Sequence, residues 1–172
     1  MSVPRPQLSL TSIYLPQVVG MLAEGIGTAA IIRQVIVSPN QATSLLPGQA
    51  VKYDTSLTGN SVPGIVACAQ NAYADGYVIY DIKNGGNASN SPLTSGTVCQ
   101  ICIFGAMLML VDGTTIQPGQ VVEDGADAGG VEPLGTTAGA FPRGVALAYG
   151  VSGAVIPVDL YPGVTKVVAA AA

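Results

Sequence analysis

The residues best suited to chemistry in this sequence are three cysteines, two of which have the spacing of a metal or redox site. Cys99 and Cys102 form a CxxC pair, and Cys68 is the third thiol. A structural zinc site needs four Cys or His ligands, but the chain has no histidine. A redox CxxC usually opens a helix, whereas this pair lies in the β-prone run Thr97–Phe104, where residues three apart point to opposite faces. We therefore expect three ordinary buried or half-buried thiols, and no metal or cofactor.

The residue pattern does not favour acid–base or nucleophilic catalysis. Both chemistries usually rely on histidine or on paired carboxylates with shifted pKa values. The one local acidic cluster, Glu123, Asp124 and Asp127, lies in a Gly-rich stretch that does not match the EF-hand pattern. A solvated loop is the preferred interpretation there, with a bound divalent ion as the alternative. No GxSxG elbow, P-loop or dinucleotide fingerprint occurs. The sequence predicts that the protein is not an enzyme.

Charge is scarce for a chain of 172 residues. Charged residues make up 9% of the sequence, against roughly 25% in an ordinary soluble domain. Apolar residues make up 49%. A monomer of this size keeps much surface in water and normally uses Lys, Glu and Arg to do so. The composition therefore indicates that much of the surface faces another protein.

The charge balance also excludes two classes of partner. The net charge is −4, and nucleic acid is held mainly by clustered Lys and Arg. The basic residues are instead single and scattered: Arg5, Arg33, Lys52, Lys83, Arg143 and Lys166. The most apolar stretch, Val18–Val37, is interrupted by Glu24, Arg33 and glycines, so it does not resemble a membrane-spanning helix. We expect no direct nucleic-acid binding, no membrane association and no signal peptide.

Frequent Gly and Pro between short β-prone runs predict an all-β fold, a compact β-sandwich or β-barrel of jelly-roll-like or β-tulip-like form. The expected organisation is an extended N-terminal arm (1–17), a single β domain (18–163) and a short C-terminal tail (164–172). Val18–Val37 is ambiguous between helix and strand; a loop to Thr28 followed by a strand is preferred. The expected strands are Ala30–Val37, Gln49–Tyr53, Ile65–Gln70, Tyr77–Ile82, two strands within Thr97–Val111 divided at Gly105, Gln120–Glu123, Gly144–Tyr149 and Ala154–Leu160. Asp112-Gly113 is a hairpin signal, and 124–142 is expected to be a Gly-rich connection.

A faint internal repeat accompanies these strands. The turn-strand unit Leu46–Val51 (LPGQAV) is echoed by Gln117–Val122 (QPGQVV). Gly64–Ala67 also resembles Gly144–Leu147, and Asp75–Tyr80 resembles Ser152–Pro157. An ancestral duplication and the ordinary reuse of turn chemistry in β-proteins both remain open as explanations.

Residues 1–16 predict an extended arm with an apolar side. Pro4, Pro6 and Pro16 favour extended backbone, and Leu8 and Leu10 fall at the even spacing of one strand face. An arm of this kind is ordered mainly through contacts with something else.

Taken together, the P-G-Q-x-V units, the segment Arg143–Ala148 (RGVALA) and the closing strand Gly153–Leu160 resemble the capsid decoration, or cement, proteins of tailed bacteriophages. The resemblance covers about residues 45–163. It implies a structural protein that binds the outer surface of the capsid and stabilises contacts between major capsid proteins. It further implies a homotrimer or dimer on the virion, made in the host cytoplasm.

The resemblance also implies that the arm is the partner-binding element, for the capsid or a neighbouring subunit. The expected contact residues are Pro4, Arg5, Pro6, Leu8, Leu10, Ile13 and Tyr14. Two alternatives remain: another virion assembly subunit, from a tail, a fibre or a head-fibre base, and a ligand-binding β module.

Overall fold

The computed structural model describes residues 19–23, 30–57, 59, 62–70, 72–80, 92–135 and 140–161. Within these ranges the protein is all-β and contains no helix, which confirms the predicted fold class. The strands are β1 (Ile31–Val37), β2 (Ala50–Tyr53), β3 (Gly64–Ala67), β4 (Gly76–Val78), β5 (Val98–Val111), β6 (Val121–Asp124), β7 (Gly130–Pro133), β8 (Gly144–Ala146) and β9 (Val155–Leu160).

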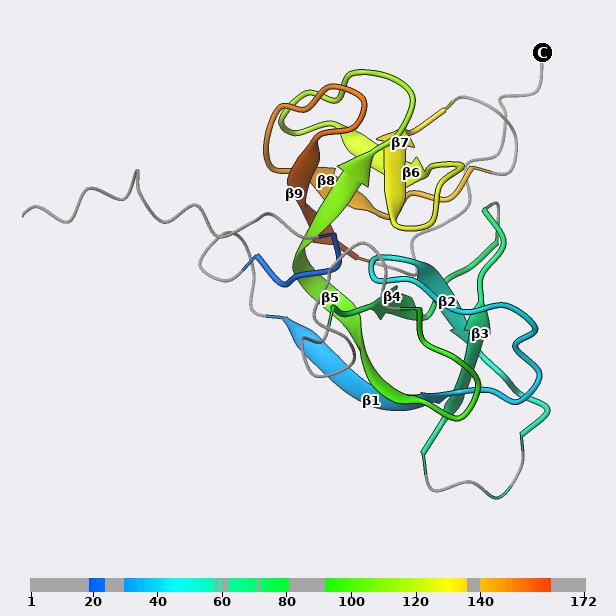
Figure 1. The fold of residues 1–172 in the computed structure, drawn as a ribbon. Coiled ribbons are helices and arrows are strands. Elements are labelled where there is room, and N and C mark those ends of the chain that lie inside the picture. Colours follow the sequence, from blue (N-terminus) through cyan, green and yellow to red (C-terminus); the bar gives the residue numbers. More distant parts are fainter. Residues whose placement is uncertain are drawn as a thin grey trace, which may run out of the picture.

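The first five strands close into a small barrel (Figure 1). β1 pairs in parallel with β3, β2 lies between β3 and β4, and β4 pairs with β5. The amino-terminal half of β5 then returns to β1 through an antiparallel ladder, which completes the ring. Val35 and Val37 alternate into the interior and are fully buried, as the two-residue period of a strand requires.

The carboxyl-terminal half of β5 starts a second barrel, formed with β6 to β9. In this ring β5 pairs in parallel with β7 and antiparallel with β9, and β6 and β8 complete the circuit. One 14-residue strand therefore belongs to both barrels. The prediction that Gly105 separates two strands was wrong. Gly105 adopts a φ of 119° inside a continuous β5, at the point where the strand passes from one barrel to the other.

The two barrels share one topology. In the second barrel the carboxyl-terminal half of β5 takes the place that β1 has in the first, and β6, β7 and β8 take the places of β2, β3 and β4. β9 takes the place of the amino-terminal half of β5. The correspondence extends to single hydrogen bonds. The backbone N–H groups of Leu46 and Gln117 each donate, at 3.0 Å, to the side-chain oxygen of the glutamine three residues later, Gln49 and Gln120. The structure thus favours an internal duplication over chance reuse of a turn.

The second half of the predicted repeat was misaligned. The sequence comparison matched Gly64–Ala67 with Gly144–Leu147, but the pairing pattern equates Gly64–Ala67 (β3) with Gly130–Pro133 (β7). Gly144–Ala146 (β8) is instead the equivalent of β4. Loops of different length shift the spacing between the halves, and a short Gly-Val or Gly-Ile pattern fits several strands equally well.

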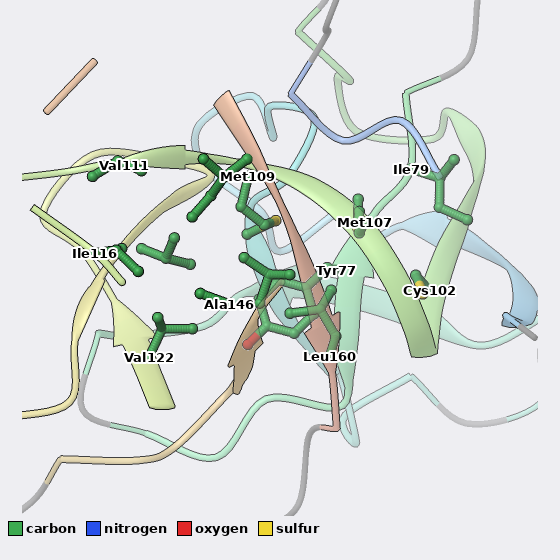
Figure 2. Packing of buried hydrophobic residues seen from close by; sticks show 13 residues of the cluster. Tyr77, Ile79, Cys102, Met107, Met109, Val111, Ile116, Val122, Ala146 and Leu160 are labelled. Carbon is green, nitrogen blue, oxygen red and sulfur yellow. The ribbon is translucent and has the colours of Figure 1, made fainter. Parts of the chain in front are cut away.

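Each barrel has its own hydrophobic core, and equivalent positions supply both cores. The matched pairs include Val35 and Met109, Val37 and Val111, Leu45 and Ile116, Val51 and Val122, and Ile65 and Val131. The second core also extends to Tyr77, Ile79 and Cys102, which come from strands and a connection of the first barrel (Figure 2). Burying one such apolar side chain contributes about 1.5–3 kcal/mol, so this contact holds the barrels against each other.

Most other expected strands are confirmed to within a few residues, with two exceptions. β7 lies inside the stretch 124–142 that was expected to be a connection. Asp112-Gly113 was expected to join a hairpin, but the strands on either side of it do not pair, because β7 lies between them. Within the described residues, no helix is long and apolar enough to cross a membrane.

Candidate functional site

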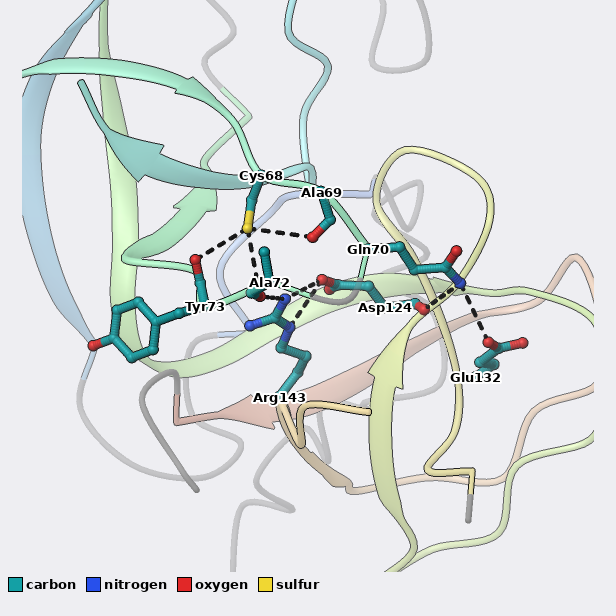
Figure 3. A network of polar contacts seen from close by, with 8 residues as sticks. All are labelled: Cys68, Ala69, Gln70, Ala72, Tyr73, Asp124, Glu132 and Arg143. Atoms are coloured by element: carbon teal, nitrogen blue, oxygen red, sulfur yellow. Dashed lines mark hydrogen bonds and ion pairs between the residues drawn. The ribbon is translucent and has the colours of Figure 1, made fainter. Parts of the chain in front are cut away.

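A buried ion pair lies at the seam between the barrels (Figure 3). Arg143, just before β8, is 1% exposed, and it donates to one carboxylate oxygen of Asp124 from Nε at 2.8 Å and from Nη2 at 2.6 Å. Nη2 also donates to the carbonyl oxygen of Ala72 at 2.6 Å. Ala72 belongs to the β3–β4 connection of the first barrel, whereas Asp124 ends β6 of the second. The guanidinium therefore joins the two barrels.

A second side chain crosses the same seam. Nε2 of Gln70 donates to the carbonyl oxygen of Asp124 at 3.1 Å and contacts Oε1 of Glu132 at 3.5 Å. Burial raises the pKa of the Asp124 carboxyl, and the neighbouring Arg143 opposes that rise. A charged pair removed from water is strongly sensitive to the loss of either partner. These contacts fit a structural role in fixing the barrels relative to each other.

A cavity of about 170 Å³ opens beside this network. Its lining comes from residues 48–50, Cys68 and Gln70 of the first barrel and residues 124–130 of the second. Typical small-molecule sites measure about 300–1,000 Å³ and are rich in apolar and aromatic side chains. This cavity is smaller and is lined largely by glycines and alanines, so it is a poor candidate for a ligand site.

The acidic cluster proposed as a calcium alternative does not converge on one point. Asp124 pairs with Arg143, and Oε1 of Glu123 accepts a hydrogen bond from the Gly135 amide at 2.7 Å. Among the residues that the structure describes, no group of three or more Cys, Asp or Glu side chains is placed to hold a metal ion.

The three cysteines are free thiols, and Cys99 and Cys102 are buried. Cys99 belongs to the first core and Cys102 to the second, so the CxxC pair points to opposite faces of β5, as predicted. Burial raises the pKa of both thiols to about 11, and it also raises the pKa of the half-buried Cys68.

This burial predicts slow and selective alkylation. Because the thiolate is the nucleophile, iodoacetamide at pH 8 should leave Cys99 and Cys102 unmodified in the native protein and react only at Cys68. In urea all three thiols should react. Intact-mass spectrometry distinguishes at most one adduct from three, and native labelling of Cys99 would contradict the placement of that residue in the core.

A hydrogen-bonded carboxylate joins the ends of β1 and β2. Asp54 accepts hydrogen bonds from the side chains of Ser38 at 2.5 Å, Ser56 at 2.6 Å and Asn40 at 2.8 Å. These bonds hold the pKa of Asp54 well below its ordinary value of 3.8, with the Ser38 hydroxyl as the largest cause.

The lowered pKa of Asp54 predicts a specific acid sensitivity. A carboxyl whose pKa is lower in the folded than in the unfolded state adds stability above the unfolded pKa and loses it as the pH falls. Thermal denaturation between pH 6 and pH 2 should therefore show a shallower decline for Asp54→Asn than for the wild type. Asp75→Asn is a suitable comparison, since the Asp75 carboxylate accepts a backbone hydrogen bond from the Tyr53 N–H at 2.8 Å instead of the side-chain bonds that surround Asp54. Equal slopes for wild type and Asp54→Asn would contradict the prediction.

Several large apolar side chains remain in water. Those above two-fifths exposed are Ile31, Ile32, Tyr73, Val98, Tyr149 and Val151. The strands β1 and β5 pair with each other, with Ile31 and Ile32 of β1 at one end of their ladder and Val98 of β5 at the other end. Sequence reasoning missed this surface, although the alternation of β1 with its buried Val35 and Val37 would have assigned Ile32 to the outer face.

The predicted partner-binding residues Pro4, Arg5, Pro6, Leu8, Leu10, Ile13 and Tyr14 lie outside the described residues. The first segment that the structure describes, residues 19–23, lies along β5 through an antiparallel bridge between Leu22 and Met107.

The described residues define an all-β protein of two tandem five-stranded barrels, without an assembled catalytic or metal-binding constellation among them. No protein-family model matches the sequence, and no curated protein does. Among solved structures, the chain is similar to the N base of head fiber gp8.5 of bacteriophage phi29, with 16% sequence identity and a TM-score of 0.46. The match covers 77% of this chain and 94% of the phi29 chain.

Proposed function

We propose that this protein is a structural subunit of a bacteriophage virion, which attaches to the outer surface of the head by protein–protein contacts. The observation that carries the proposal is that the surface has few charges and several exposed apolar side chains. Charged residues are few, and the buried pair of Arg143 and Asp124 removes two of them from the surface. Large apolar side chains are nevertheless exposed. Interface cores are depleted in charge in this way.

Assignment to a phage head rests on the resemblance of the P-G-Q-x-V units and the closing strand to capsid decoration proteins. A subunit of that kind clamps neighbouring major capsid proteins, and oligomerisation multiplies modest contacts into high avidity. A homotrimer or dimer on the capsid is the arrangement that we propose.

The second candidate is the base of a fibre or other appendage on the head. The all-β fold and the charge-poor surface support this candidate equally, and it too would attach to the capsid. The two candidates differ in how many copies bind and in what binding does to the shell. A ligand-binding role has less support, because the seam cavity is small and the described barrels offer no aromatic platform around it.

Sedimentation with expanded phage capsids that lack this protein tests the proposal. A cement protein should bind at high fixed stoichiometry and raise the temperature at which the capsids lose their integrity. An appendage base should bind at few sites per capsid and leave that temperature unchanged. Capsids of an unrelated phage serve as the control. Failure to sediment with the cognate capsids would contradict both candidates.

A further inference from the structure

The outer edge of β5 in the second barrel is covered by an extended segment of the same chain. The N–H of Gly20 donates to the carbonyl of Leu108 at 2.8 Å, and the N–H of Ala23 donates to the carbonyl of Ala106 at 2.9 Å. The N–H of Leu108 donates in return to the carbonyl of Met21 at 2.8 Å. Residues 20–23 thus act as an added strand.

The equivalent edge of the first barrel is on β1, and hydrogen bonds fix the register. In the first barrel the N–H of Ile36 donates to the carbonyl of Pro63. In the second barrel the N–H of Leu110 donates to the carbonyl of Gly129 in the same way. Counting back along both strands, Ile32 and Gln34 occupy the positions of Ala106 and Leu108. Because backbone groups alternate in direction along a strand, the N–H and C=O groups of Ile32 and Gln34 face outward from β1.

No residue in the described part of the chain bonds to that edge between Ile32 and Gln34. β3 reaches β1 only at Ile36 and Val37. The side chains beside the open edge are apolar and exposed, Ile31 by 56% and Ile32 by 43%. Arg33 is held to one side, where Nη1 donates to the hydroxyl of Tyr53 at 2.9 Å. An uncovered, apolar strand edge is a template for a further strand.

We propose that the edge of β1 at Ile32–Gln34 binds an extended segment from the N-terminal arm of a second copy of this chain, centred on Leu8 and Leu10. The intramolecular precedent is the strand formed by residues 20–23, from the same end of the chain, on the equivalent edge. Residues 20–23 are already held on the second barrel of their own chain by the bonds to β5. The N–H of Tyr80 adds a further bond, to the carbonyl of Gly20 at 2.9 Å.

The arm suits this site in length, charge and pattern. Eighteen residues precede Val19, which reach about 60 Å when extended at roughly 3.3 Å per residue. The stretch between Arg5 and Glu24 contains no charged residue, so its docking would desolvate no charge. Each copy has one arm and one β1 edge that the described residues leave open, so head-to-tail exchange would pair each arm with one such edge and can close a ring of subunits. The inference does not depend on the presence of a capsid.

Backbone hydrogen exchange in the full-length chain tests the donor. In the wild type the Gln34 amide should exchange at least about tenfold more slowly than in Leu8→Asp/Leu10→Asp, since an added strand protects outward-facing amides. Ser9→Asp/Thr11→Asp adds the same charge on the other side of an extended arm and should keep the protection. Fast exchange of the Gln34 amide in the wild type at every protein concentration would overturn the proposal.

Mixing identifies which copy donates the arm. Isotope-labelled Leu8→Asp/Leu10→Asp protein should regain Gln34 protection when unlabelled wild type is added. Protection that is present in the wild type but is not restored by mixing would show that the arm folds back on its own barrel, which would overturn the exchange between copies.

A substitution on the acceptor side provides an independent measurement. Gln34→Pro removes the outward N–H and leaves the ladder to β5 intact, because proline is tolerated where a strand edge faces out. The solution mass of Gln34→Pro should fall from that of an oligomer to that of a monomer, whereas Gln34→Ala should retain the oligomer. An unchanged mass for Gln34→Pro would contradict the proposal.

Discussion

Replacement of Arg143 by leucine should destabilise the protein more than any other single charged-to-apolar change, by about 3–5 kcal/mol. The substitution leaves the Asp124 carboxylate at the seam without its cation, and it leaves the Ala72 carbonyl without its 2.6 Å donor. A buried charge that has lost its partner is one of the costliest single defects in a folded protein. Urea denaturation followed by circular dichroism measures the loss.

The double substitution Arg143→Leu/Asp124→Leu is the matched control. It removes both charges, so it should recover most of the stability that Arg143→Leu loses. A double variant as unstable as Arg143→Leu would show that packing of the arginine stem, not the uncompensated charge, dominates.

The cost of Arg143→Leu should also depend on pH. Burial already raises the pKa of Asp124, and removal of Arg143 takes away the main group that opposes the rise. An acid with a raised pKa in the folded state contributes stability below its unfolded pKa and loses that contribution as the pH rises. The destabilisation should therefore be greatest near neutral pH and shrink as the pH falls toward about 4.

Replacement of Gly105 by alanine is expected to have the second largest effect, about 3 kcal/mol or more. The φ of 119° is a conformation that side chains rarely adopt, which costs about 1–3 kcal/mol. An added Cβ would also lie 2.6 Å from the Cα of Ala30, a backbone atom that cannot turn away. Overpacking of this kind adds a further 1–3 kcal/mol.

Gly153→Ala separates the two contributions. Gly153 has a φ of 83°, but a Cβ there would meet nothing within 4 Å. Its substitution should therefore show the conformational cost alone and a smaller loss in denaturant midpoint. Equal losses for the two variants would mean that the passage of β5 beside Ala30 is not tightly packed.

Several features of this fold followed from local pattern. The β-branched residues of Ile31–Val37, the turns at Pro47-Gly48 and Pro118-Gly119, and the β-branched runs near Ile65 and Ile156 all predicted strands where strands occur. The opposite orientations of Cys99 and Cys102 followed from the two-residue period of a strand. Each of these properties depends on residues close together in the chain.

Other features depended on contacts between distant residues. Arg143 looked like one more isolated basic residue, because its partner Asp124 is 19 positions away and nothing local marks the pair. β7 is short, contains Glu132 and Pro133 and lies in a Gly-rich stretch, so its strand character comes from pairing with β5 and β6 rather than from propensity. Gly105 looked like a strand end because the sequence does not reveal that one strand serves two barrels.

The sequence by itself determined that this is a charge-poor, all-β chain with turns repeated in its two halves, because composition and turn chemistry are written in single residues and their neighbours. Only the tertiary structure decided that the halves form two barrels of one topology, that Arg143 and Asp124 join them, and that residues 20–23 cover the β5 edge while no described residue covers the equivalent edge of β1. Those outcomes depend on which distant backbone and side-chain groups meet, and hydrogen bonds and burial between them are settled only when the chain folds.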